Sequence, residues 1–165
     1  MTPARLGLRF ALVVLILDQL SKWWILGPFA LPAKVTVPVI DGFFNLTMVW
    51  NRGVSMGLFR ADSDAGRWLL TGLTGAIAAL VAYWLLKEQS RAQALALGGI
   101  LGGAIGNIAD RVRFGAVADF LHFHLMGYSF YVFNVADAAI TLGVAALLFI
   151  GLARPRHDQK AETNE

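Results

Sequence analysis

The sequence predicts an α-helical polytopic membrane protein with four transmembrane helices and a small sheet outside them. Three observations lead to this fold class. Charged residues make up only 15% of the chain and hydrophobic residues 57%, whereas a soluble domain has about 25% charged residues. Four apolar runs are long enough to cross a bilayer, which takes about 20 residues. A segment rich in Val, Phe and Thr separates the first two runs, and the length of 165 residues fits a single domain.

The apolar runs place the four spans at about residues 6–26, 68–86, 92–109 and 135–152. Asp18 and Lys22 interrupt the first run, and no small-x-small cleavage site follows it. We therefore interpret it as a retained span rather than a cleaved signal peptide. In the third run, glycines recur at every fourth position, at Gly98, Gly102 and Gly106. This spacing lets other helices approach closely and predicts that the third span lies centrally in the bundle.

Basic residues set the predicted orientation. Arg5 and Arg9 precede the first span, two more basic residues lie between the second and third spans, and others follow the fourth. Lys and Arg in short segments beside the spans favour the cytoplasmic side. Both termini, including a tail at 153–165, are therefore predicted to be cytoplasmic. The net charge of +3 is not gathered in a Lys/Arg cluster on a polar helix, so we predict no nucleic-acid binding.

Two segments remain on the outer side. Residues 35–59 contain the breakers Pro38, Gly42 and Gly53 between short runs of Val, Phe and Thr. This pattern predicts a few short strands in a small sheet on the outer surface. Residues 116–133 mix apolar and ionisable side chains. They are too few and too interrupted to span, so we expect this stretch to lie at the membrane interface.

Ionisable residues within membrane spans are costly and need a structural or functional reason. Asp18 and Lys22 are one helical turn apart, in the acid-then-base order that favours an ion pair. We interpret them as a structural polar pair. Asp110 and Arg111 end the third span, and we interpret them as structural too, with Arg111 bound to a carboxylate or to backbone carbonyls.

Asp119 and Asp137 are the candidate catalytic residues. Asp119 lies in an apolar stretch with no Lys or Arg within three positions. Asp137 follows Asn134 by three positions, a spacing that also fits a helix N-cap with an acid at the third helical position. A helix rises about 1.5 Å per residue, so Asp137 is close to the helix start. Both acids are therefore expected at one depth, near the outer membrane surface.

Two carboxyl groups held close together in a low dielectric share one proton. The ionised one can take a proton from water while the protonated one donates to the scissile carbonyl oxygen, so the pair predicts aspartyl-protease chemistry. The chain has no cysteine, and it lacks the G-x-S-x-G and H-E-x-x-H motifs of other hydrolases. His122 and His124 with the two acids are a weaker alternative as a metal site. We predict no metal and no cofactor.

A small transporter is the alternative from a different functional class. Its path for protons or cations would run through four acids, Asp18, Asp110, Asp119 and Asp137. Such a path predicts acids spread through the depth of the membrane. Three of the four lie towards the outer face by the predicted span limits, which favours the enzyme.

Five sequence blocks, in order, match one known family. They are D-Q-L-S-K at 18–22, N-R-G-V-S-M-G at 51–57, G-N-I-A-D-R at 106–111, V-A-D-F at 117–120 and F-N-V-A-D-A at 133–138. Each block is weak alone, but together, in a chain of this size with four predicted spans, they are specific. The chain resembles the bacterial lipoprotein signal peptidase (signal peptidase II) family over nearly its whole length.

The resemblance implies an activity and the residues that perform it. The family removes signal peptides from prolipoproteins that carry a diacylglyceryl group, and it cuts just before the lipidated cysteine. By position, Asp119 and Asp137 match its catalytic aspartates. Asp18 and Lys22 match the polar pair of its first helix. The residues that match its substrate-binding or site-lining groups are Asn51, Gly53, Asn107, Asp110, Arg111 and Asn134.

The resemblance also implies a setting for the site. It implies an extracytoplasmic β-cradle and an interfacial helix beside a four-helix bundle in the bacterial inner membrane, with the site near the outer face. The expected partners are the lipid-modified prolipoprotein and membrane lipids. A monomer is expected, and so is inhibition by globomycin. The chain departs from the family's common N-T-G-A-A-F-G at Arg52, Val54, Ser55 and Met56, where substrate or inhibitor preference can differ.

Overall fold

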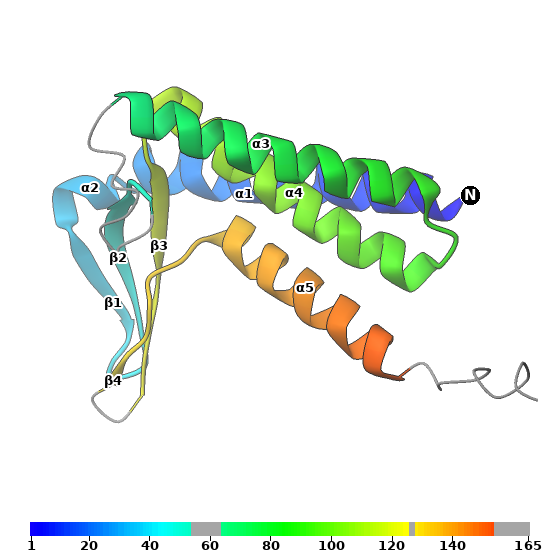
Figure 1. Cartoon of the computed structure of the whole chain (residues 1–165). Coiled ribbons are helices and arrows are strands. Elements are labelled where there is room, and N and C mark those ends of the chain that lie inside the picture. Colours follow the sequence, from blue (N-terminus) through cyan, green and yellow to red (C-terminus); the bar gives the residue numbers. More distant parts are fainter. Residues whose placement is uncertain (54–63, 126–127, 154–165) are drawn as a thin grey trace, which may run out of the picture.

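A computed structural model describes residues 1–53, 64–125 and 128–153. Its long helices are α1 (Pro3–Leu26), α3 (Asp64–Lys87), α4 (Arg91–Phe114) and α5 (Val135–Ala153). These helices run along the long axis of the molecule, and a small sheet lies across one end of the bundle (Figure 1). The N-terminus and the C-terminal end of α5 lie at the opposite end. Each long helix covers one of the four apolar runs of the sequence.

Three helices of the described residues, α3, α4 and α5, are long and apolar enough to cross a membrane. The helix α1 has 24 residues, as α3 and α4 do. However, the charged residues Arg5, Arg9, Asp18 and Lys22 interrupt its apolar stretch, so its span stays a prediction. The predicted cytoplasmic tail after Ala153 lies outside the described residues.

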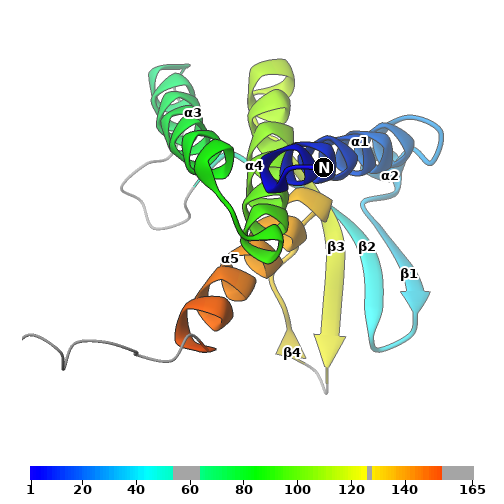
Figure 2. The same ribbon diagram turned by 90° about the vertical axis from the view of Figure 1, so that its right-hand side faces the viewer.

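The helix α4 is central, as its glycine spacing predicts. In its most apolar stretch 61% of the residues are buried, against 17% in α3 and 11% in α5. A Cβ on Gly98 would collide with the Gly7 carbonyl of α1, and one on Gly103 would lie 2.5 Å from the Ala136 carbonyl oxygen of α5. The glycines therefore let α1 and α5 approach two faces of α4. Figure 2 shows α4 between the other long helices.

The helix α4 continues past residue 109, where the third span is predicted to end. It stops at Phe114 because Gly115 takes the left-handed conformation, with φ 76°, and donates its N–H to the Arg111 carbonyl. Asp110 and Arg111 therefore lie within the last turns of α4. This end of the helix contacts the sheet.

The sheet has four antiparallel strands in the order β1-β2-β3-β4. They are β1 (Thr36–Ile40), β2 (Phe44–Asn51), β3 (Val117–Leu125) and β4 (Tyr128–Ser129). The first two confirm the strands predicted in residues 35–59, of which 54–59 lie outside the described residues. Sequence patterning does not reveal β3, because residues 117–120 are all buried and show no alternation of polar and apolar side chains.

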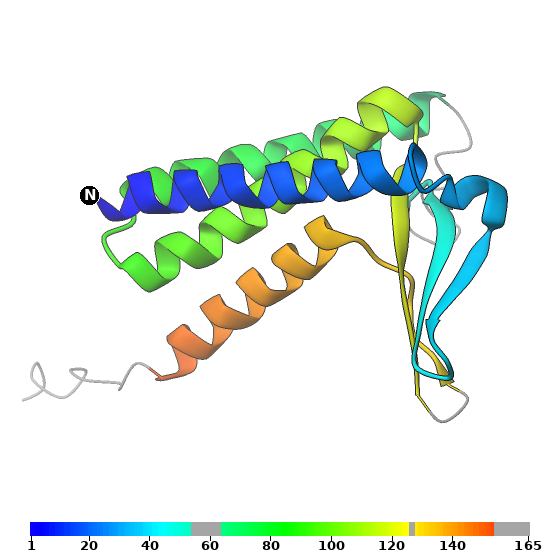
Figure 3. The ribbon, with the colours of Figure 1, turned by 180° about the vertical axis from the view of Figure 1, so that it is seen from behind.

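The predicted interfacial helix has only a short counterpart among the described residues, α2 (Leu31–Lys34), with four residues. Leu31 packs with Ile25 at the end of α1 and with Phe120 on β3 in a small apolar cluster. This cluster fixes the sheet against the end of the bundle. Figure 3 shows the sheet at that end from behind.

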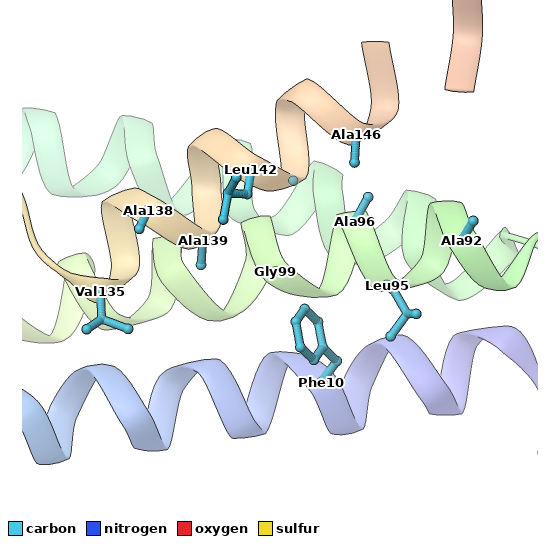
Figure 4. A pocket seen from close by; sticks show the side chains of 11 residues that line it. Phe10, Ala92, Leu95, Ala96, Gly99, Val135, Ala138, Ala139, Leu142 and Ala146 are labelled. Atoms are coloured by element: carbon cyan, nitrogen blue, oxygen red, sulfur yellow. The ribbon is translucent and has the colours of Figure 1, made fainter. Parts of the chain in front are cut away.

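The helix α5 diverges from α1 and leaves an apolar hollow of about 420 Å³ between α1, α4 and α5. Phe10 points into the hollow from α1, near Gly99 of α4 and Ala139 of α5 (Figure 4). All of its lining residues are apolar or glycine. The hollow therefore belongs to the apolar body of the bundle rather than to the polar network at the sheet end.

Candidate active site

The two candidate catalytic acids meet where the sheet joins the bundle. Asp119 lies on β3 and is fully buried, and Asp137 lies half-buried in the first turn of α5. Asp119 is the partner of Val49 on β2, just beyond an irregularity in the pairing of β2 with β3. The two acids therefore come together in the interior from a strand and a helix, a contact that the sequence pattern does not predict.

Asn134 joins the two acids. Its side-chain amide donates to Asp119 Oδ1 over 2.7 Å, and its backbone N–H donates to Asp137 Oδ2 over 3.2 Å. In return, the Asp137 N–H donates to Asn134 Oδ1 over 2.9 Å. This reciprocal pair is the helix cap that the spacing of the two residues suggests. Capping and catalysis are compatible roles for Asp137, because the cap holds its carboxylate beside the residue that binds Asp119.

Two further amides bind the carboxylates. Asn51 donates from Nδ2 to Asp119 Oδ2 over 3.0 Å, and Asn107 of α4 donates from Nδ2 to Asp137 Oδ1 over 2.8 Å. The Gly53 N–H donates to Asn51 Oδ1 over 3.0 Å, which fixes the orientation of that amide. All four carboxylate oxygens therefore accept a hydrogen bond from an asparagine. The amides carry no charge, but those of Asn51 and Asn134 donate to Asp119 and so favour its ionised form.

Burial and the neighbouring charge of Asp137 raise the pKa of Asp119 from 3.8 to about 7. Hydrogen bonds from Asn51 and Asn134 and the charge of Lys22 oppose this rise. In the folded protein Asp119 therefore keeps its proton up to about pH 7, as one member of a proton-sharing pair does. One group can then act as the acid and the other as the base.

A second polar group borders the first. Lys22 Nζ lies 2.8 Å from Asp18 Oδ2 and 2.8 Å from Asp110 Oδ2. The ion pair of Asp18 and Lys22 thus has Asp110 as a third member. Gln19, which sequence analysis misses, donates from Nε2 to Asp18 over 3.1 Å and to Asp110 over 3.2 Å. It is an uncharged residue inside the D-Q-L-S-K block, and that block is the only signal that points to it.

The fork predicted for Arg111 is absent among the described residues. Its Nε is buried and has no hydrogen-bond partner there. The negative charges of Asp137, Asp119 and Asp110 act on its guanidinium. Arg111 therefore supplies positive charge beside the acids, and its Nε is not engaged with any of them.

A cavity of about 560 Å³ opens beside Asp137. Its lining residues are Tyr131, Phe133, Asp137, Ala138, Thr141 and Leu142. The hydroxyl of Tyr131 accepts a hydrogen bond from Asn51 Nδ2 over 2.9 Å. Burial, followed by the charges of the two acids, raises the pKa of Tyr131. Sequence analysis misses this residue because it is one of several aromatic residues before Asn134 and belongs to no motif.

The two histidines weighed as metal ligands form other contacts. His122 bonds the hydroxyls of Thr47 and Ser129, and His124 bonds Asn45. Within residues 1–53, 64–125 and 128–153, no group of three or more His, Cys, Asp or Glu side chains could hold a metal ion. The structure therefore does not bring the histidines together with the two acids.

Relatives of the chain share most of its length. A family described as signal peptidase (SPase) II matches residues 10–153. A lipoprotein signal peptidase of Methylobacterium sp. (strain 4-46) is 51% identical over 148 residues, which cover 90% of this chain and 89% of that protein. One of Rhizorhabdus wittichii is 53% identical over 148 residues, which cover 89% of this chain and 86% of that protein.

Two solved structures of bacterial membrane enzymes, both determined by the in meso method, have a similar fold. One gives a TM-score of 0.78 at 28% identity and covers 96% of this chain and 94% of its own. The other gives 0.76 at 29% identity and covers 90% and 93%. The family match, the curated relatives and the fold agree over nearly the whole chain. The chain therefore belongs to the signal peptidase II family.

Proposed function

We propose that the chain is an intramembrane aspartyl endopeptidase that removes the signal peptide from diacylglyceryl-modified prolipoproteins. The proposed cut lies just before the lipidated cysteine. The observation that carries the proposal is the pair of Asp119 and Asp137, joined by Asn134. The raised pKa of Asp119, about 7, fits a pair of acids that shares a proton. The relatives named lipoprotein signal peptidases supply the substrate class.

In the proposed reaction, the ionised carboxylate takes a proton from a water molecule, and the water oxygen attacks the scissile carbonyl carbon. The protonated carboxyl group donates its proton to the carbonyl oxygen. The tetrahedral intermediate then collapses. The carboxyl group that took the water proton gives it to the leaving nitrogen as the C–N bond breaks, and one hydroxyl group of the intermediate returns a proton to the other carboxylate. The pair again holds one proton at the end of the cycle. Asn51, Asn107 and Asn134 keep the two carboxylates oriented through these transfers.

The cavity beside Asp137 suits an apolar substrate. Its walls come mainly from Tyr131, Phe133 and Leu142. Apolar groups of a lipidated peptide can enter it from the membrane side, because burial of apolar surface is favourable. The cavity would then hold the peptide bond next to the two acids.

The membrane setting is part of the proposal. We assign α1 as the fourth span beside α3, α4 and α5, because Leu12, Leu17 and Leu20 leave its outward face apolar and exposed. The basic residues beside the spans favour a cytoplasmic position for both termini. The sheet lies at the opposite end of the helices (Figure 1), so it would stand on the outer face of the bacterial inner membrane. One chain supplies both acids and all three asparagines, so a monomer suffices.

The transporter alternative is weaker. The four acids that it would use belong to connected hydrogen-bond and ion-pair networks at the sheet end of the bundle. A transport path needs polar groups along the depth of the membrane. The family match is to a peptidase rather than to a transporter.

Incubation of the purified protein in detergent with a diacylglyceryl-modified prolipoprotein, with and without EDTA, tests the proposal. We expect a cut before the lipidated cysteine in both samples. Asp119→Asn and Asp137→Asn should each abolish it. Asp41→Asn, which changes an exposed acid between β1 and β2, should not. Loss of activity in EDTA with recovery in zinc would contradict the aspartyl mechanism, and no cut by folded wild-type protein would contradict the function.

A further inference from the structure

Each of the two proposed catalytic acids follows a residue whose backbone N–H is bound by a buried carboxylate. The N–H of Ala136, at the start of α5, donates to Asp18 Oδ1 over 3.0 Å. The N–H of Ala118, at the start of β3, donates to Asp110 Oδ2 over 3.1 Å. All four residues have an exposed fraction of 0%. Water therefore does not compete for these hydrogen bonds.

A single ammonium group joins the two carboxylates. Lys22 Nζ is 2.8 Å from Asp18 Oδ2 and 2.8 Å from Asp110 Oδ2. Its third contact, at 3.3 Å, is with Asn107 Oδ1, and Asn107 donates in turn to Asp137. An ammonium group has three N–H donors, and the three contacts can use all of them. Lys22 is itself only 2% exposed.

We propose that Lys22 is a positioning residue that fixes the two catalytic acids relative to each other, an inference that rests on the proposed proteolysis. By joining Asp18 to Asp110, Lys22 joins the start of α5 to the start of β3. These two elements carry Asp137 and Asp119. The residue thus acts through backbone amides and touches neither catalytic carboxylate among the described contacts.

The arrangement exceeds what a stabilising ion pair needs. One cation partners two buried carboxylates, and the burial of charge is costly unless each charge is compensated. Gln19 also donates to both carboxylates, but a neutral amide cannot offset their mutual repulsion. Without the ammonium charge, Asp18 and Asp110 would repel each other and move the two amides apart. A misplacement of about 1 Å can lower a rate about a hundredfold.

Three variants and one control test the proposal in the prolipoprotein assay. Lys22→Met removes the charge, Lys22→Arg keeps it, and the triple change Asp18→Asn, Lys22→Met and Asp110→Asn removes all three charges but leaves oxygen acceptors for both N–H groups. Lys34→Met, at an exposed lysine of α2, is the matched control. We expect Lys22→Met to lower kcat about a hundredfold with KM within about threefold. Lys22→Arg and the triple variant should each recover about tenfold or more of that loss.

Hydrogen–deuterium exchange supplies a readout that does not depend on activity. Peptides that contain Ala118 and Ala136 should exchange faster in Lys22→Met than in wild-type protein, and the triple variant should restore slow exchange. Unchanged kcat and slow exchange in a less stable Lys22→Met would overturn the proposal, because Lys22 would then only stabilise the fold. If Lys22→Met does not fold, a folded and inactive triple variant would overturn it as well. If folded wild-type protein does not cleave, the proteolytic function fails, and the exchange rates still decide whether Lys22 holds the two segments.

Discussion

Asp119→Asn should abolish cleavage and yet stabilise the protein at alkaline pH. Burial and the charge of Asp137 raise the pKa of Asp119 from 3.8 to about 7. Between about pH 4 and pH 7 the folded state therefore binds a proton that the unfolded chain has released. Stability falls as the pH rises through this window. Each pKa unit corresponds to about 1.4 kcal/mol, so ionised Asp119 costs about 4 kcal/mol above pH 7.

The asparagine removes this charge but introduces a polar mismatch. Asp119 accepts hydrogen bonds from both Asn134 and Asn51, so the new amide nitrogen must face one of these donors. A buried donor left without an acceptor costs about 1–3 kcal/mol. The net gain expected at pH 8 is therefore about 1–3 kcal/mol. Near pH 4 the wild-type carboxyl group is protonated in the folded state, so the variant should be the less stable protein there.

Thermal unfolding in detergent at pH 4, 6 and 8, beside the cleavage assay, measures both effects. Asp41→Asn, which changes an exposed acid in the turn between β1 and β2, is the matched control. A stability difference between Asp119→Asn and wild type that stays constant from pH 4 to pH 8 would refute the raised pKa. Substantial cleavage by Asp119→Asn would remove this residue from the catalytic pair.

Three further outcomes are expected. Gly103→Ala should destabilise the protein by about 1–3 kcal/mol, because the new Cβ would lie 2.5 Å from a backbone oxygen of α5. The control is Gly72→Ala, whose new Cβ would have nothing within 4 Å and should stabilise α3 by about 1 kcal/mol or less. If thermal unfolding shows the same change in stability for both variants, the packing argument is wrong. Tyr131→Phe removes the hydroxyl that accepts from Asn51 and should lower kcat/KM about fivefold; a loss above about a hundredfold would instead give the hydroxyl a part in the chemistry. A reporter fused after Glu165 should be active only in the cytoplasm, and activity only after export would reverse the topology.

The helices are the part of the fold that the sequence predicts best, because apolar runs and glycine spacing depend on local composition. The central position of α4 follows from its glycines, and the structure places them against α1 and α5. The end of α4 is less predictable, since Asp110 and Arg111 look like the edge of a span but precede the true stop at Gly115. The strand β3 is missed because it is buried at its start and offers no polar–apolar alternation around Asp119.

The site is predictable as a set of residue types but not as a set of contacts. The spacing of Asn134 and Asp137 suggests the helix cap, and the structure contains it. The contact between Asn134 and Asp119 depends on where β3 meets α5, which no local pattern encodes. Gln19 and Tyr131 are missed for a related reason. Neither is charged or periodic, and each matters only through the groups that tertiary packing brings to it.

The groups that bond the two acids among the described residues are neutral, and the nearest bonded cation pairs with other carboxylates. This separation affects the pKa of the acids. A cation bonded directly to a carboxylate lowers its pKa, and a strong enough effect would leave both acids ionised and unable to share a proton. The groups that bind Asp119 and Asp137 are instead neutral asparagines. The ammonium group of Lys22 pairs with Asp18 and Asp110, and among the described contacts these two carboxylates do not bond the catalytic carboxylates directly. Charge can then hold the backbone in place while the pKa of Asp119 stays near 7, where one proton serves both acids.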